Sequence, residues 1–135
     1  MISHDPKQVV LRFNKEVLQN GNEEVFKEIM HPDFINRTPA TVSNKADGVW
    51  QNISKVLRPA FPDLQVVIYD QICEGDKVTT RKAILGTHLG EIMGVKPTER
   101  KVKIDVIDIV RVQDGKYIEH WGINNLYKVV EELKK

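Results

Sequence analysis

The sequence of 135 residues contains one cysteine, Cys73, and no long apolar run. A single cysteine cannot form a disulfide within the chain, and it cannot build a metal cage of thiolates. A membrane-spanning helix needs about 20 consecutive apolar residues, so we expect no membrane association. The first residues are polar and lack the apolar core of a signal peptide. Together these absences predict a cytoplasmic protein.

The sequence also lacks an excess of charge of either sign. Lys and Arg total 20, and Asp and Glu total 19. No segment concentrates basic side chains between aromatic ones, as electrostatic nucleic-acid binders do, so nucleic acid is not expected as a partner.

Motifs for metals, phosphates and covalent catalysis are absent as well. The four histidines lie in separate segments, and none has a second ligand one helical turn or one strand repeat away. There is no P-loop and no Gly-x-Ser-x-Gly elbow around a serine. We therefore expect no metal, no cofactor and no covalent intermediate.

The length and composition fit one globular domain over residues 1–135, with 41% hydrophobic and 29% charged residues. Apolar residues at helical spacing predict a helix over residues 6–19, with Asp5 as its N-cap. A second helix is predicted over residues 23–30, capped by Asn22 and ended by His31-Pro32. Asn44 or Asp47 can open a third helix, whose inward face includes Trp50.

After Pro62 the apolar spacing changes to a period of two, which is typical of strands. We predict strands over residues 64–73, 77–88, 101–112 and 117–124, with hairpin turns at Gly75 and Gly115. A last helical turn or two is predicted over residues 128–135. The fold class is therefore α+β, with a curved antiparallel sheet packed against three N-terminal helices around a cone-shaped cavity.

Asp108 is the exception on an otherwise apolar strand face, which also carries Val106 and Val110. A carboxylate that faces an apolar interior needs hydrogen-bond partners, or burial raises its pKa as in many general acids and bases. We therefore predict Asp108 as a catalytic residue with a raised pKa. The alternatives are a structural pair with an arginine, a loop cap, or a bulge that turns the side chain outward.

The same face of the last strand carries His120, Gly122 and Asn124, so they can join Asp108 in the cavity. An imidazole beside a carboxylate is a common proton-handling pair, which makes His120 the second candidate catalytic residue. A structural or exposed histidine is the alternative. His88 lies between two glycines at a strand end, where it can contact a substrate or hydrogen-bond the loop.

Several segments in order resemble the SnoaL-like polyketide cyclase family. They are Pro32-Asp33-Phe34-Ile35-Asn36, Ala60-Phe61-Pro62-Asp63-Leu64, Gly86 to Thr98, Ile107-Asp108-Ile109-Val110-Arg111, and Asp114 to Trp121. The resemblance covers nearly the whole chain. It implies the nuclear-transport-factor-2-like cone, an apolar pocket, a homodimer formed through the sheet, and cofactor-free aldol chemistry on a small apolar carbonyl compound.

Two positions differ from the pattern that the resemblance implies. Gly122 stands where the family commonly has an aspartate acid/base, and Arg37 stands where a histidine is common. We hypothesise that Asp108 is the base and His120 a proton shuttle, and that Arg37 or Asn124 stabilises an enolate. Trp50, His88 and Gly122 complete the candidate substrate contacts. The alternatives are a non-catalytic protein that binds a hydrophobic ligand, and a scaffold whose exposed sheet face makes protein contacts.

Overall fold

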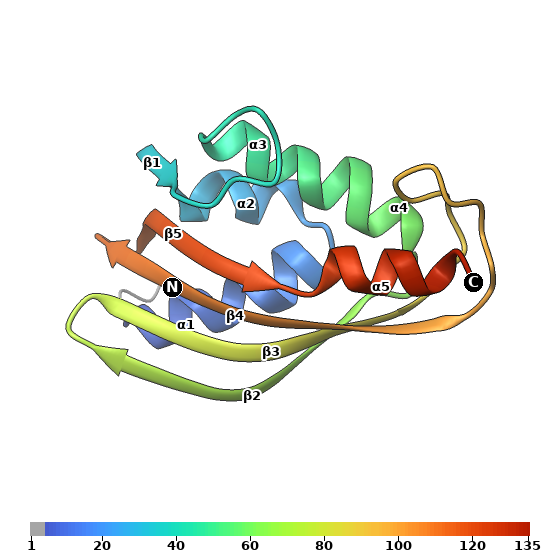
Figure 1. Ribbon diagram of the computed structural model, residues 1–135. Coiled ribbons are helices and arrows are strands. Elements are labelled where there is room, and N and C mark those ends of the chain that lie inside the picture. Colours follow the sequence, from blue (N-terminus) through green and yellow to red (C-terminus); the bar gives the residue numbers. More distant parts are fainter. Residues whose placement is uncertain (1–4) are drawn as a thin grey trace.

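The computed structural model describes residues 5–135, so His4 and most of the polar start lie outside the described residues. Helices gather on one face of a curved five-stranded sheet (Figure 1), whose strand order is β1-β5-β4-β3-β2. The first and last strands of this order are not paired with each other, so the sheet is an open cone rather than a closed barrel. The α+β fold class predicted from the sequence is confirmed.

The three predicted N-terminal helices are present. Helix α1 (Pro6–Arg12) continues into a π-helical segment, η1 (Phe13–Gln19), and α2 (Glu23–Ile29) follows. The third helix comprises α3 (Ala46–Gln51), the π-helical η2 (Asn52–Leu57) and α4 (Arg58–Ala60).

Side chains cap the first two helices as predicted. Asp5 accepts the backbone N–H of Lys7, and Asn22 accepts that of Val25. The predicted cap of the third helix is wrong, because the N-cap residue is Lys45 and has no side-chain cap. Asp47 lies inside the first turn instead, where its carboxylate accepts the N–H of Gly48.

Four long strands form the antiparallel part of the sheet. They are β2 (Gln65–Glu74), β3 (Lys77–Thr87), β4 (Lys101–Gln113) and β5 (Lys116–Asn124). Gly75 and Gly115 occupy the predicted hairpin turns with φ of +62° and +74°, a region that glycine adopts without strain. The chain ends in α5 (Leu126–Leu133), which buries Val130 and Leu133.

One strand was not predicted. β1 (Met30–Asn36) lies at the edge of the sheet and pairs in parallel with β5, so the sheet is not wholly antiparallel. Pro32 lacks an N–H and suggested a loop, but an edge strand tolerates proline because one of its sides has no partner. The pairing places Asn36 directly opposite His120.

A bulge in β5 changes the face on which Tyr117 lies. Asp108 pairs with Gly122 and Val110 with His120, but the register then shifts and Val112 pairs with Tyr117. Strict alternation would place Tyr117 on the outer face with Trp121. The shift turns Tyr117 inward, where it is buried.

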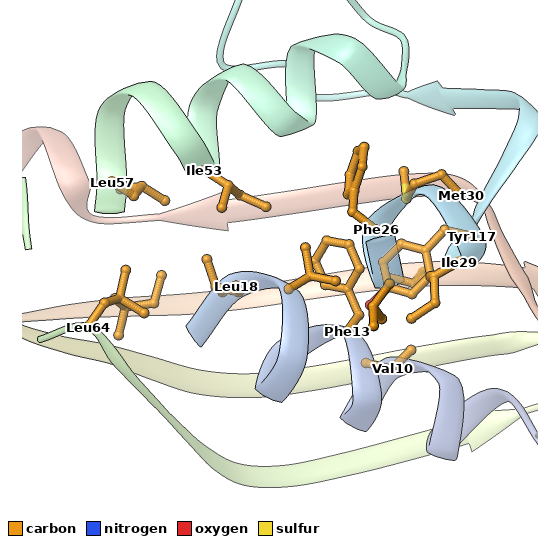
Figure 2. Close-up of a cluster of buried hydrophobic side chains, with 14 of the residues drawn as sticks. Val10, Phe13, Leu18, Phe26, Ile29, Met30, Ile53, Leu57, Leu64 and Tyr117 are labelled. Atoms are coloured by element: carbon orange, nitrogen blue, oxygen red, sulfur yellow. The ribbon is translucent and has the colours of Figure 1, made fainter. Parts of the chain in front are cut away.

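The apolar core lies between the helices and the concave face of the sheet. Figure 2 shows aromatic side chains meeting in its centre, where Phe13 of η1 stacks on Tyr117 with ring centroids 4.5 Å apart. Phe26 lies 6.4 Å from Phe13 and 5.0 Å from Trp50. Between residues 5 and 135, no helix has the length and apolar character required to cross a membrane.

Candidate functional site

A cavity of about 160 Å³ opens between the helices and the inner face of the sheet. Much of its wall is apolar and comes from the core, including Phe13, Phe34 and Ile53. The polar side chains are mostly contributed by the strands: Asn36, Lys82, Asp108, His120 and Asn124. The cavity therefore has an apolar part and a polar part that contains titratable groups.

Asp108 lies on the inward face of β4 and is 8% exposed. Its two carboxylate oxygens differ in their surroundings. Oδ2 lies 3.2 Å from the Lys82 ammonium and 3.6 Å from Nε2 of His120. Oδ1 is buried and has no hydrogen-bond partner in the described part of the chain. This oxygen therefore has unused hydrogen-bonding capacity, and neighbouring atoms cover it in this structure.

Lys82 is a functional candidate that the sequence interpretation missed. It lies on β3 opposite Val106, on the inward face, and it is 5% exposed. Its ammonium donates to Oδ1 of Asn14 at 2.6 Å and to Asp108 at 3.2 Å. The signal was present in the sequence, because Val78, Thr80, Lys82 and Ile84 alternate along one strand face with a single charge among them.

The predicted rise in the pKa of Asp108 is wrong. Burial raises the pKa of this carboxyl, but the positive charge of Lys82 and the contacts with His120 together outweigh burial and hold it below its ordinary value. Of the alternatives considered for Asp108, the structural pair is the one present, although the partner is a lysine and not an arginine. Asp108 is therefore a carboxylate at neutral pH.

The hydrogen bonds of Asn36 fix the orientation of His120. Oδ1 of Asn36 accepts the backbone N–H of Thr38 at 3.1 Å, so this atom is an acceptor, and it lies 2.9 Å from Nδ1 of His120. Nδ1 must then carry the proton. Nε2 consequently faces Asp108, and it is the nitrogen that carries the second proton when the ring is an imidazolium.

Gly122 lies opposite Asp108 and under the ring of His120. A Cβ atom added at this position would lie 3.0 Å from Cε1 of His120 and 3.3 Å from Cβ of Asp108. The N–H of Gly122 donates to the hydroxyl of Thr38. Glycine therefore lets the imidazole approach the strand closely, which is one of the uses of glycine within a strand.

The structure brings only some of the predicted substrate contacts to the cavity. Gly122 and Asn124 line it, but Arg37 does not: its guanidinium is 48% exposed and pairs with Glu119 at 2.7 Å. Phe34 and Asn36 line the cavity from β1, whereas Ile35 between them and Arg37, directly after the strand, do not.

Trp50 and His88 also lie away from the cavity. Trp50 packs on Phe26 in the core. Ile53, further along the same helix, lines the cavity instead. His88 is fully buried, and its Nδ1 accepts the N–H of Thr98 at 3.2 Å, which ties the two ends of the loop between β3 and β4. The hydrogen-bonding role in the loop is thus the one that the structure supports.

Comparisons with known proteins agree with this geometry. A family model described as SnoaL-like polyketide cyclase matches residues 8–133. Nogalonic acid methyl ester cyclase from Streptomyces nogalater is 26% identical over 106 residues, which cover 74% of this chain and 76% of the cyclase.

Solved structures show the same fold over nearly the whole chain. IdmH from Streptomyces antibioticus, described as a candidate polyketide cyclase, is 29% identical with a TM-score of 0.81, and the match covers 98% of this chain and 100% of IdmH. A candidate SnoaL-like polyketide cyclase from Jannaschia is 26% identical with a TM-score of 0.83, over 98% of this chain and 93% of that protein.

Proposed function

Because the chain belongs to the SnoaL-like polyketide cyclase family, we propose that it is a cofactor-free acid/base enzyme that forms or breaks carbon–carbon bonds, or shifts a proton, next to a carbonyl group. Family membership supports a cyclase-like function. The observation that carries the proposal is the Asp108–His120 pair in the cavity, in which Oδ2 of the carboxylate lies beside the Lys82 ammonium and the His120 imidazole.

In the proposed cyclisation, the carboxylate of Asp108 takes a proton from the carbon beside a carbonyl, and the electrons of the C–H bond form an enolate. The enolate carbon attacks a second carbonyl of the same molecule, which forms the new bond and leaves an alkoxide. Protonated His120 gives its Nε2 proton to that alkoxide. Asp108 then passes its proton to the neutral imidazole, which restores both groups.

In this scheme Asn124, which lines the cavity, stabilises the enolate oxygen through its amide N–H group, because its Oδ1 already accepts the N–H of Leu126. Arg37 is left out, since it pairs with Glu119 on the outside. The small volume and partly apolar wall favour a small, largely apolar carbonyl compound as the substrate. A cytoplasmic location is part of the same proposal.

Hydrogen–deuterium exchange tests this function with a small ketone such as cyclohexanone in D₂O, followed by NMR. We expect the protein to accelerate loss of the α-proton signal, and Asp108→Asn to reduce that acceleration by about 10²- to 10⁴-fold. Asp105→Asn, an exposed aspartate on the same strand, is the matched control. Equal exchange with and without protein would contradict the proposal.

A second candidate function is the binding of a hydrophobic ligand without catalysis. The specific observation in its favour is that Lys82 lowers the pKa of Asp108, which weakens this carboxylate as a base. Gly122 also stands where the family resemblance implies a carboxylate. A rise in melting temperature with small apolar ketones, in the absence of any exchange, would support binding alone.

A further inference from the structure

We propose that Lys82 and Asn14 are positioning residues that hold the Asp108 carboxylate in its place in the cavity, with the ammonium of Lys82 contacting Oδ2. This inference rests on the proposed acid/base function, and it deepens that function by assigning roles to two buried residues, on β3 and η1. Lys82 lines the cavity beside Asp108, and Asn14 does not line it. Both act through Asp108.

The first argument is the burial of a lysine among apolar neighbours. A buried ammonium is costly unless it is paired and hydrogen-bonded, and Lys82 is 5% exposed between the core residues of β3 and β4. An apolar residue at this position would pack without that cost. The ammonium is paired with the only buried carboxylate of the described chain, which is Asp108.

The second argument is that Asn14 orients the ammonium. Asn14 is 2% exposed on η1, and its Nδ2 donates to the backbone oxygen of Val10 at 2.9 Å. That bond points Oδ1 of Asn14 at Lys82, 2.6 Å away. A lysine has only donors, so the amide can satisfy both neighbours in this orientation alone. Asn14 lies in a π-helical segment, a local widening that is frequent at functional sites.

The third argument concerns the charges that surround Asp108. Lys82 faces it from β3, His120 faces it from β5, and the buried phenol of Tyr117 lies on the same side of β5. From the helices, the uncharged Asn14 reaches the network through Lys82. Lys82 is therefore the one permanent positive charge in contact with Asp108 among the described residues. Removing it leaves only the imidazole of His120 in contact with Asp108.

The test is the variant Lys82→Met, which keeps the length of the side chain and removes its charge. Carbon NMR of the Asp108 carboxyl follows its titration, and the same samples give the pH profile of cyclohexanone exchange. We expect the titration midpoint of Asp108 to move upward. The acid limb of the exchange profile should move with it, with at least about tenfold loss at pH values below the new midpoint and retained exchange above it.

Lys103→Met is the matched control, because Lys103 lies on β4 and its side chain is 58% exposed. It should change neither the titration nor the profile. Asn14→Leu should move the Asp108 midpoint in the same direction as Lys82→Met but by less, since the ammonium remains.

Several outcomes would overturn the proposal. One is an unchanged Asp108 midpoint in folded Lys82→Met, and another is a loss of exchange that is uniform with pH, which a merely structural lysine would give. If Lys82→Met does not fold at pH 7, the proposal requires that the double variant Lys82→Met/Asp108→Asn does fold, because the pair is then uncharged. A double variant that also fails to fold counts against it. The titration distinguishes this inference from the proposed function, because it is measured without a substrate.

Discussion

At the scale of single residues, Gly122 shows how a missing side chain shapes the site. The imidazole of His120 lies so close that an added Cβ atom would be 3.0 Å from its Cε1, a tight contact. Position 122 therefore carries no carboxylate, and the imidazole of His120 packs against it instead. Asp108 and His120 form a pair in contact because position 122 is glycine.

Gly122→Ala should therefore disturb His120 more than the fold. The new Cβ would lie 3.0 Å from Cε1 of the ring and 3.3 Å from Cβ of Asp108, so the ring has to shift by a few tenths of an ångström and its contact with Asp108 changes. We expect a loss of stability of roughly 1 kcal/mol and about tenfold slower exchange. The Cε1–H resonance of His120 reports the shift directly.

The control for Gly122→Ala is the double variant Gly122→Ala/His120→Ala. When the ring is absent, the added methyl group no longer presses on it. The double variant should therefore be as stable as His120→Ala alone. An equal cost with and without the ring would show that the strain lies in the backbone of β5 instead.

At the scale of elements, the period of two along β4 and β5 predicted that Asp108, His120 and Asn124 share one face, and the structure shows them together. Local spacing also predicted the two hairpin turns and two of the helix caps. These features depend on residues close in sequence, which is why they could be read from one chain.

The parts that were missed depend on contacts between distant segments. Asn36 joins His120 because a proline-containing segment becomes an edge strand, and nothing in residues 30–36 alone requires that. Arg37 was expected to contact the substrate because it stands where the family resemblance implies a histidine, but its side chain pairs with Glu119. Lys82 was visible as an isolated charge on an apolar face, but its role required the position of Asn14 on a different element.

The bulge in β5 leads to a pH-dependent prediction for Tyr117. Burial, and then the charge of Asp108, raise the pKa of this phenol well above the ordinary 10.0. In the unfolded chain the phenol ionises near its ordinary value, so ionisation favours the unfolded state above that pH. Tyr117 therefore contributes stability that is fully present below about pH 10 and is lost as the pH rises toward the higher folded value.

Tyr117→Phe removes this dependence and keeps the ring stacked on Phe13. Between the two pKa values, the wild-type stability relative to the variant should fall by about 1.4 kcal/mol for each pH unit. Urea unfolding at several alkaline pH values measures it. Tyr127→Phe, at an exposed site on α5, is the control. Parallel stability curves for wild type and Tyr117→Phe would show that the phenol is not buried in the folded protein.

At the scale of the whole molecule, the outer face of the sheet has no helix over it (Figure 1). It carries exposed apolar side chains from three strands: Ile72 at 67%, Ile107 at 44% and Ile123 at 71%. A hollow of about 360 Å³ lies on this side between Tyr69, Arg81, Ile107 and Ile123. Ion pairs such as Arg81–Asp70 surround the apolar residues. An apolar centre with a charged surround is typical of an interface.

We predict that a second copy of the chain covers this face, with Trp121 and Ile123 in the contact. Two copies related by a two-fold axis would bury the same apolar residues on each. The chain has 20 basic and 19 acidic residues, so the two copies do not repel each other through a large net charge.

Ile123→Asp should place a charge in the centre of the contact and shift the protein to the monomer mass of 15.5 kDa in light scattering. Val42→Asp, a fully exposed apolar site on a loop, should leave the dimer intact. A monomer mass for the unmodified protein across a wide concentration range would rule the dimer out, and the exposed isoleucines would then need another partner.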